Sequence, residues 1–492
     1  MHGTNYDLSH DRIRDVAYAE LSPIQGKLLH RRVAEALLKY HADSLDSVSA
    51  QLAYHAEVAG LYDQAAGYYL QAGEAAQHVY ANEQAVALLN RGIILLESQL
   101  ATPQRDQQRL ALYASLAASL LVTRGWTSAE LYDAAYEAWQ LSEKLHDLKQ
   151  RFRLINSLNV HYLVRGDLDR AHQFALRALE IAEQQQSADF FVLAHRGQAA
   201  THFCRGTFRL AHEYFEKSLS VYDSQQHGMH HFLGTADHGL ISYAWGAHTL
   251  WLLGYPDQAL DQCCAGVRLA RELNHPFSEA LTLAYLSTLY LFRQELDEVC
   301  VAIKRCLTVA QEYNLGFYHR WAHILLAWVR ALKDPTPNEL TAFQEALANY
   351  QADGAALRLP FFLSLQAQLY TKTRQIEAGL ESILQAFAAA AHDQEDWWNV
   401  ELYRLRGKLL DLGGAEAVQV ETVYQQAIDL AREQTALALE LRATVSLARL
   451  WQRQGRIVEA HAQLSTVYTQ FTEGFHTPDL QEAQTLLADL AQ

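Results

Sequence analysis

The sequence predicts an all-α fold, an α-solenoid of antiparallel helix hairpins with a period of about 40 residues. First, the chain has only 24 glycines and 8 prolines, about half of the usual share, which favours long helices with short connections. Second, apolar residues recur with helical spacing. Third, a small residue recurs once per hairpin. A repeat array also suits 492 residues, since a single hydrophobic core stops growing at a shorter length.

The segment 167–186 shows the helical pattern most clearly. Its apolar residues fall on one face of a helix and its charged residues on the other, the apolar ones being Ala171, Phe174, Ala175, Ala178, Leu179 and Ala182. A second predicted helix, 149–165, precedes it and ends at Gly166. Similar Gly-containing turns begin at Gly60, Gly206, Gly254 and Gly455. Glycine at these positions can adopt the left-handed conformation that ends a helix.

A short side chain precedes each predicted turn by seven residues. The positions are Ala53, Ala117, Asn159, Ala199, Ala247, Ser287, Ala327, Ala367, Gly407 and Ala448. From Asn159 onward, successive positions are 40, 48, 40, 40, 40, 40 and 41 residues apart. Two helices approach closely only where one of them lacks a bulky side chain. This spacing therefore predicts stacked hairpins.

Three parts of the chain follow from this register. We expect a helical linker segment over 1–45, about ten hairpins over 46–475 and a capping helix over 476–492. The hairpin near 77–106 is irregular, and those at 316–353 and 396–434 have weak turn signals.

Charge and composition narrow the classes of partner. The net charge of −16 disfavours nucleic acid, because duplex binders usually carry a concentrated basic face. No apolar run approaches the ~20 residues needed to cross a bilayer, so we expect no membrane contact. The cysteines Cys204, Cys263, Cys264, Cys300 and Cys306 lack zinc-type spacing. Unpaired thiols in a long chain favour a soluble protein of the reducing cytoplasm.

No assembled catalytic or cofactor motif is present, and we expect a non-enzymatic chain without a cofactor. The candidate metal site is the loop that interrupts the period, 224–238, with His227, His230, His231, Asp237 and His238. A solvent-exposed insertion is the favoured interpretation, and a metal-dependent enzyme using 227–238 is the less favoured one.

The concave side of the predicted superhelix is the candidate partner-binding surface. In such hairpins the first helix lines this side, and the register assigns inward positions to Asn156, Arg196, His248, Trp251, Thr288, Trp328, Ser364, Gln368, Thr371, Arg404, Lys408, Arg449 and Gln452. Tryptophan and arginine often anchor partners. Two alternatives remain open: Trp251 and Trp328 pack between repeats, and the basic residues form a solvated face paired with acids.

The hairpin pattern resembles the tetratricopeptide repeat, which implies a right-handed superhelix, and its long period resembles the variant of maltose-regulator-type bacterial activators. The segment from Ser9 to Tyr18 (SHDRIRDVAY), followed by LHRRVA from Leu29, is similar to the end of the winged-helix segment in STAND-type ATPases. Leu8 and Asp15 replace the phenylalanine and glutamate common there. The resemblance assigns the histidine matching His10 to a nucleotide-facing position, although a local hydrogen bond near a helix start is favoured here.

The resemblance implies a sensor or scaffold arm of a bacterial signal-transduction or transcription-regulating ATPase system. Such an arm binds a protein or peptide, here with an acidic peptide as the favoured chemistry, in its concave groove. The alternative is a small-molecule inducer in the same groove. No phosphate-binding loop occurs in the chain: Gly26-Lys27 and Gly407-Lys408 lack the rest of the motif. Any ATPase module is therefore expected upstream of Met1 or on another chain.

Overall fold

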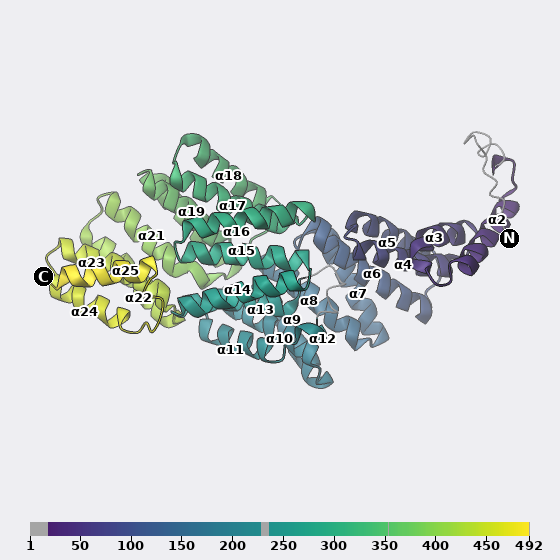
Figure 1. Cartoon of the computed structure of the whole chain (residues 1–492), viewed down its shortest axis with the longest axis horizontal. Helices are drawn as coiled ribbons and strands as arrows, with labels where there is room; N and C mark the ends of the chain where they lie inside the picture. The colour runs from purple at the N-terminus through teal and green to yellow at the C-terminus, as the bar shows by residue number, and fades with distance from the viewer. Residues whose placement is uncertain (1–17, 228–235, 353, 492) are drawn as a thin grey trace. The chain divides into compact units, whose positions relative to one another are not determined.

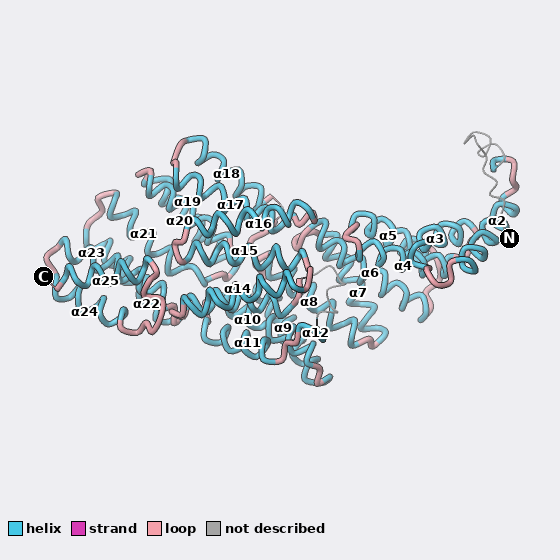
Figure 2. Tube along the Cα trace, in the orientation of Figure 1, coloured by secondary structure: helices cyan, strands magenta, loops and turns pink. Residues whose placement is uncertain are grey.

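The chain is built from helices and turns. The computed structural model describes residues 18–227, 236–352 and 354–491, and over these ranges no strand is present (Figure 1, Figure 2). The described residues form two compact units. Unit 1 contains those up to Leu120 together with 133–150, and unit 2 contains 121–132 and 151 onward. The predicted all-α solenoid of antiparallel hairpins is confirmed.

Unit 1 contains the first helices of the array. They are α2 (Pro23–Tyr40), η1 (Leu45–Val48), α3 (Ser49–Val58), α4 (Tyr62–His78) and α5 (Asn82–Glu97), followed by α6 (Pro103–Arg124) and α7 (Ala129–Leu145), which each contribute residues to both units. Ser22 and Gln25 form a capping box that fixes the start of α2. Helix α4 packs on both α3 and α5. In the irregular region near 77–106, α5 lies between the end of α4 and the start of α6.

The described part of unit 2 contains eight hairpins, two short helical segments and a final helix. Its elements are α8 (Leu148–Val164), α9 (Leu168–Gln185), α10 (Ala188–Cys204), α11 (Phe208–Ser220), α12 (Ser224–His227), α13 (His238–Leu252), α14 (Pro256–Glu272), α15 (Pro276–Phe292), α16 (Leu296–Glu312), α17 (Gly316–Lys333), α18 (Pro337–Gln351), α19 (Leu359–Lys372), α20 (Ile376–Asp393), η3 (Asp396–Trp398), α21 (Asn399–Leu412), α22 (Ala417–Gln434), α23 (Leu437–Arg453), α24 (Ile457–Tyr468) and α25 (Pro478–Leu490). In Figure 1 consecutive helices from α13 to α18 lie side by side.

The small residues mark the first helix of each hairpin, as the sequence predicted. All ten are buried. Asn159 shows how such a position works, because its side-chain amide donates to the Ala171 carbonyl of α9 at 2.7 Å. At Gly407, an added Cβ would lie 2.5 Å from the Tyr424 ring of α22. Bulkier side chains would therefore separate the paired helices.

The predicted turn glycines have left-handed backbones, with φ of +82° at Gly166, +72° at Gly206 and +96° at Gly254. At the equivalent turns after α15 and α19, Gln294 and Arg374 take the same conformation, with φ of +60° and +55°. The turn geometry therefore persists where the sequence lacks glycine, at a cost in backbone strain.

Unit 2 closes on itself. A Cβ at Gly166 would lie 2.4 Å from Asp393, one at Gly206 would lie 2.4 Å from Gln434, and one at Gly254 would lie 2.7 Å from Leu437. Each contact joins a turn to the hairpin five repeats further along the chain. The turn glycines thus serve both the local conformation and these close approaches. The first helices, which face inward, are enclosed: nearly every residue of α15 is buried.

Several inner helices are strongly apolar. Among the described helices, however, none combines the length and the hydropathy needed to cross a membrane.

Candidate functional site

The predicted concave positions divide into an interior set and a surface set. Asn156, Arg196, His248, Trp251 and Trp328 are all buried, at 5%, 2%, 0%, 3% and 4% exposure. We predicted an open groove along these positions, whereas the structure fills this region with side chains. The reason is the closure of unit 2, which places the inner helices against distant hairpins. No partner reaches these five side chains in this conformation.

The two tryptophans pack inside unit 2, which was one of the two interpretations open from the sequence. Trp251 stacks on Phe292 with ring centroids 4.8 Å apart, and the Arg442 guanidinium lies 4.9 Å from the Trp251 ring. The Trp328 indole donates to the Leu365 carbonyl at 3.2 Å. Both side chains link neighbouring or distant hairpins and hold the closed unit together.

The polar members of the interior set also have internal partners. Arg196 donates to Asn156, and burial lowers the pKa of Arg196 to about 10. His248 pairs through Nε2 with the Tyr285 carbonyl at 2.8 Å. Burial, followed by the Arg358 charge, holds the pKa of His248 well below its usual value. His248 is therefore neutral at physiological pH, and its pairing with a carbonyl requires that Nε2 carry the proton.

An aromatic cage surrounds Arg358 at the centre of unit 2. The guanidinium carbon lies 4.7–5.3 Å from five ring centroids, those of Phe203, Trp245, Tyr285, Trp321 and Trp397. Arg358 is fully buried. Its three side-chain nitrogens make no hydrogen bond of normal geometry to any described residue. The cation is therefore held mainly by the faces of the rings, and the Tyr285 hydroxyl and the Glu395 carboxyl lie close enough to interact with its charge.

Glu395 completes this interior site. Both of its carboxyl oxygens accept from the Arg358 backbone N–H at 2.9 Å, and one accepts from the Trp397 indole at 2.6 Å. Burial raises the pKa of Glu395 to about 8, and the hydrogen bonds from Trp397 and Arg358 offset this only in part. These contacts hold Arg358 in a left-handed backbone conformation, with φ of +62°. Cage and carboxyl together fix the start of α19.

The surface set lies at α19, α21 and α23. Gln368 is partly exposed. Arg404, Lys408 and Arg449 come together as a C-terminal basic cluster, in which Lys408 and Arg449 are exposed. Arg404 makes two hydrogen bonds, of 2.6 and 2.7 Å, with the buried Glu401, and Arg449 donates to Glu482 at 2.8 Å. Nearby acids thus balance much of this charge.

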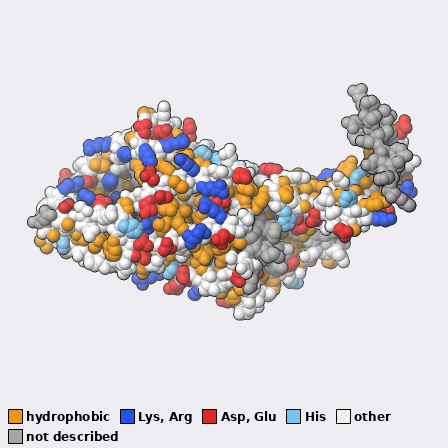
Figure 3. All heavy atoms as spheres, viewed as in Figure 1, with side chains coloured by type: hydrophobic (Ala, Val, Ile, Leu, Met, Phe, Trp, Pro, Cys, Tyr) orange, Lys and Arg blue, Asp and Glu red, His pale blue; other side chains and the backbone are white. Residues whose placement is uncertain are grey.

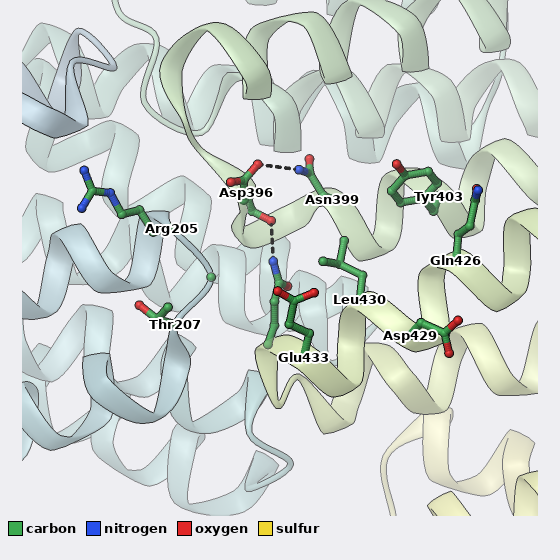
Figure 4. Close-up of a pocket in the computed structure, with 11 residues that line it drawn as sticks. Arg205, Thr207, Asp396, Asn399, Tyr403, Gln426, Asp429, Leu430 and Glu433 are labelled. Carbon is green, nitrogen blue, oxygen red and sulfur yellow. Dashed lines mark hydrogen bonds between the residues drawn. The ribbon is translucent and has the colours of Figure 1, made fainter.

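A surface cleft of about 530 Å³ lies elsewhere in unit 2 (Figure 4). Three elements form it: the turn between α10 and α11, the segment from η3 into α21, and one face of α22. We call it the acceptor cleft, and its lining residues are Arg205, Gly206, Thr207, Asp396, Asn399, Tyr403, Gln426, Asp429, Leu430, Glu433 and Gln434. The α22 residues recur at intervals of three and four, which places them on one helix face.

Hydrogen bonds within the cleft centre on Asp396. The Asn399 side chain donates to the Asp396 carboxylate at 2.7 Å, and the Gln434 side chain donates to the Asp396 backbone carbonyl at 3.0 Å. Burial raises the pKa of Asp396, an effect that the Asn399 hydrogen bond opposes. Asp429 and Glu433 are exposed on α22.

Part of the loop proposed for a metal lies outside the described residues, including His230 and His231. His227 ends α12 and His238 begins α13. Asp237 is buried and caps α13, since its carboxylate accepts from the Leu240 backbone N–H at 3.0 Å. Across the described parts of the chain, no group of three or more His, Cys, Asp or Glu side chains is arranged to hold a metal ion.

The N-terminal motif is described only in part. Residues up to Ala17, including His10, lie outside the described ranges. His30 of the LHRRVA segment is buried, with Nε2 2.7 Å from the Tyr18 hydroxyl and Nδ1 2.8 Å from Nδ1 of His55. This histidine packs α2 against α3 within unit 1.

A comparison with curated proteins finds a longer relative of this chain. No model of a known protein family matches the chain. The chain is 22% identical over 454 residues to an uncharacterized protein of Rhizobium meliloti (strain 1021), a match that covers 91% of this chain and 43% of the relative. The chain therefore spans less than half of the length of the relative it matches.

Solved structures similar to this chain are also helical, but the likeness is weak. A Rap protein complexed with competence and sporulation factor has a TM-score of 0.41 and 13% identity, with 86% of this chain and 99% of that chain covered. A Rap conjugation gene regulator in complex with the Phr* peptide has a TM-score of 0.44 and 10% identity, with 80% of this chain and 97% of that chain covered. Yeast Tom70 has a TM-score of 0.35 and 12% identity, with 91% of this chain and 96% of that chain covered.

Sequence reasoning missed both the aromatic cage and the acceptor cleft. The cage has one periodic signal, since Trp245 and Tyr285 are 40 residues apart, two positions before their respective small residues. Nothing local indicates that Arg358 enters this ring cluster. The cleft combines residues near 206 with residues near 430, and only the closure of unit 2 brings these segments together.

Proposed function

We propose that this chain is a non-catalytic sensor or scaffold arm of a bacterial signal-transduction or transcription-regulating ATPase system, and that it binds a protein or peptide partner. The observation that carries the proposal is the C-terminal basic cluster. It gathers three of the side chains predicted to contact a partner, and two of them, Lys408 and Arg449, are exposed. The chain covers 43% of the Rhizobium relative, and the proposal includes an ATPase module in cis or in trans.

The favoured occupant of this cluster is an acidic peptide. Arg449 and Glu482 are both about half exposed, at 53% and 46% of their side chains, and such surface pairs contribute little stability. A peptide carboxylate can therefore replace Glu482 at small cost. On the face seen in Figure 3, acidic and basic side chains of unit 2 are interspersed, which supports a protein partner over nucleic acid.

A small-molecule inducer in the concave groove is the weaker alternative. The aromatic lining that would hold it is buried, and Arg358 occupies the space between the rings. An inducer at that position would require unit 2 to open.

The test is charge reversal at the exposed cations. A fluorescein-labelled peptide of alternating glutamate and leucine is titrated with the wild-type chain and with the variant Lys408→Glu/Arg449→Glu. We expect about tenfold or greater weakening in the variant, since charge pairs are replaced by repulsion, and binding that falls with added salt. Arg404 is left intact because the buried Glu401 depends on it.

The matched control is Arg406→Glu/Arg374→Glu, which changes the same charge at exposed positions outside the cluster. It should bind like the wild type. Equal weakening in both double variants would show that net charge alone drives capture and would refute the cluster as the binding site.

A further inference from the structure

The acceptor cleft leaves hydrogen-bond acceptors without donors. The side-chain oxygens of Asn399 and Gln434 are buried and have no partner among the described residues, and Gln434 is only 7% exposed. The orientation of both amides is fixed by Asp396. The Gln434 amide nitrogen donates to the Asp396 backbone carbonyl, and the Asn399 amide nitrogen donates to the ionised Asp396 carboxylate. The amide oxygens of both side chains are thus left without a donor among the described residues.

The charge of the cleft has the same bias. Asp396, Asp429 and Glu433 contribute three carboxylates to the lining, whereas Arg205 is its single basic side chain. Arg205 is already engaged, since it donates to Asp169 at 2.5 Å, and Asp169 is not part of the lining. Acceptor oxygens and uncompensated negative charge therefore coincide in one concave site.

We propose that the acceptor cleft binds a cationic group with several N–H donors, a guanidinium or an alkylammonium. A guanidinium offers five N–H donors in a plane and pairs with carboxylates through two parallel hydrogen bonds. It can pair with the exposed carboxylates of Glu433 and Asp429 on α22. The Gln434 side chain also lines the cleft, and its buried amide oxygen has no donor of its own. The volume, about 530 Å³, falls within the usual range for small-ligand sites and exceeds the volume of the cation itself. The group can belong to a free amine or to a basic side chain of a peptide.

This site is separate from the C-terminal basic cluster and selects the opposite charge. Its occupation does not depend on the proposed acidic partner. The turn at Gly206 forms one wall, and the other walls come from hairpin α21–α22, five repeats further along the chain. A bound cation would therefore bridge the two segments whose contact closes unit 2.

Calorimetric titration with matched probes tests the proposal. Agmatine presents a guanidinium and an alkylammonium on a free small molecule. Acetyl-Gly-Arg-Gly-amide presents a guanidinium in a peptide, and acetyl-Gly-citrulline-Gly-amide is its neutral counterpart. Each is titrated into the full wild-type chain and into the variant Asp429→Asn/Glu433→Gln. Both substitutions are at exposed positions of α22, and unchanged circular dichroism and melting temperature will show that the fold is kept.

We expect the wild type to bind at least one guanidinium probe and to ignore the citrulline peptide, with about tenfold weaker binding in the cleft variant. The control variant Glu345→Gln/Glu377→Gln removes two exposed carboxylates from α18 and α20 and should bind like the wild type. Binding of agmatine alone supports a free cation as the natural ligand, and equal or tighter binding of the arginine peptide supports a peptide side chain. The proposal is overturned if neither guanidinium probe binds the wild type, or if the cleft variant binds as well as the wild type.

Discussion

At the scale of single residues, Arg358 poses the clearest energetic question. Burying a cation without a hydrogen-bonded partner costs several kcal/mol. A desolvated cation–π contact contributes up to about 2 kcal/mol, and five rings lie within 5.3 Å of this guanidinium. The rings are therefore numerous enough to offset the cost of burial. The same arrangement explains why this cationic side chain stays inside unit 2.

The substitution Arg358→Met separates charge from volume. Methionine fills the cage but lacks the cation, so we expect the free energy of unfolding to fall by about 1–3 kcal/mol in chemical denaturation. Arg406→Met, at an exposed position of α21, is the control and should change little. Stability equal to or above that of the wild type would show that the cage only tolerates the charge.

The raised pKa of Glu395 predicts that the stability of the folded chain depends on pH. Its pKa in the folded chain is about 8, against about 4.3 for an unperturbed glutamate. Between these values the folded state holds a proton that the unfolded chain has released. Stability from this group is therefore complete below about pH 4.3 and is lost as the pH rises toward 8.

The measurement is the difference in unfolding free energy between the wild type and Glu395→Gln across this range. We expect the wild type to lose stability relative to the variant as the pH rises, by at most about 1.4 kcal/mol per pH unit. A difference that is constant with pH, or that grows in the opposite direction, would show that the carboxyl is ionised throughout.

At the scale of helices and turns, local sequence predicts most of what is observed. Segment 167–186 was predicted as an amphipathic helix, and α9 spans Leu168–Gln185 with Asp167 as its N-cap. The small residues, from Ala53 to Ala448, occupy the buried faces of the first helices. The weak turn signal at 396–434 corresponds to Gly414, which has φ of +78° at the turn into α22.

Turn strain gives a reciprocal prediction. Arg374→Gly should raise the unfolding free energy by about 0.5–1 kcal/mol. Glycine relieves the strain of the left-handed backbone, and the greater entropy of the unfolded glycine chain offsets part of that gain. Gly455→Ala should lower it by about 1 kcal/mol, because an added Cβ meets no atom within 4 Å and only backbone strain changes. Thermal unfolding of both variants checks the pair, and a change of the same sign in both would contradict this explanation.

At the scale of unit 2, stability depends on contacts between distant hairpins. Glu473 accepts from the backbone N–H groups of Asp257 and Gln258 at 2.8 and 3.0 Å, while Asp257 accepts from the Gly474 N–H at 2.9 Å. A carboxylate from the far end of the chain thus caps α14, where backbone donors are otherwise unsatisfied. The closed interior rests on such reciprocal contacts.

Removal of this cap tests the closure. Glu473→Ala should cost about 1–2 kcal/mol in chemical denaturation and should accelerate amide hydrogen exchange at Asp257 and Gln258. Glu377→Ala, at an exposed position of α20, is the control. Unchanged exchange at the start of α14 would show that the contact is not formed in solution.

The sequence by itself determined the all-helical class, the repeat of about 40 residues, the turn positions and the small residues at the helix contacts. These features depend on interactions within one hairpin or between adjacent ones, and such interactions leave a periodic record in the chain. Only the tertiary structure decided that the predicted inner residues, from Asn156 to Trp328, are enclosed, that Arg358 enters an aromatic cage, and that segments near Gly206 and Gln434 form a cleft. The physical reason is that superhelical closure sums small rotations over five repeats, and no local pattern of residues fixes that sum.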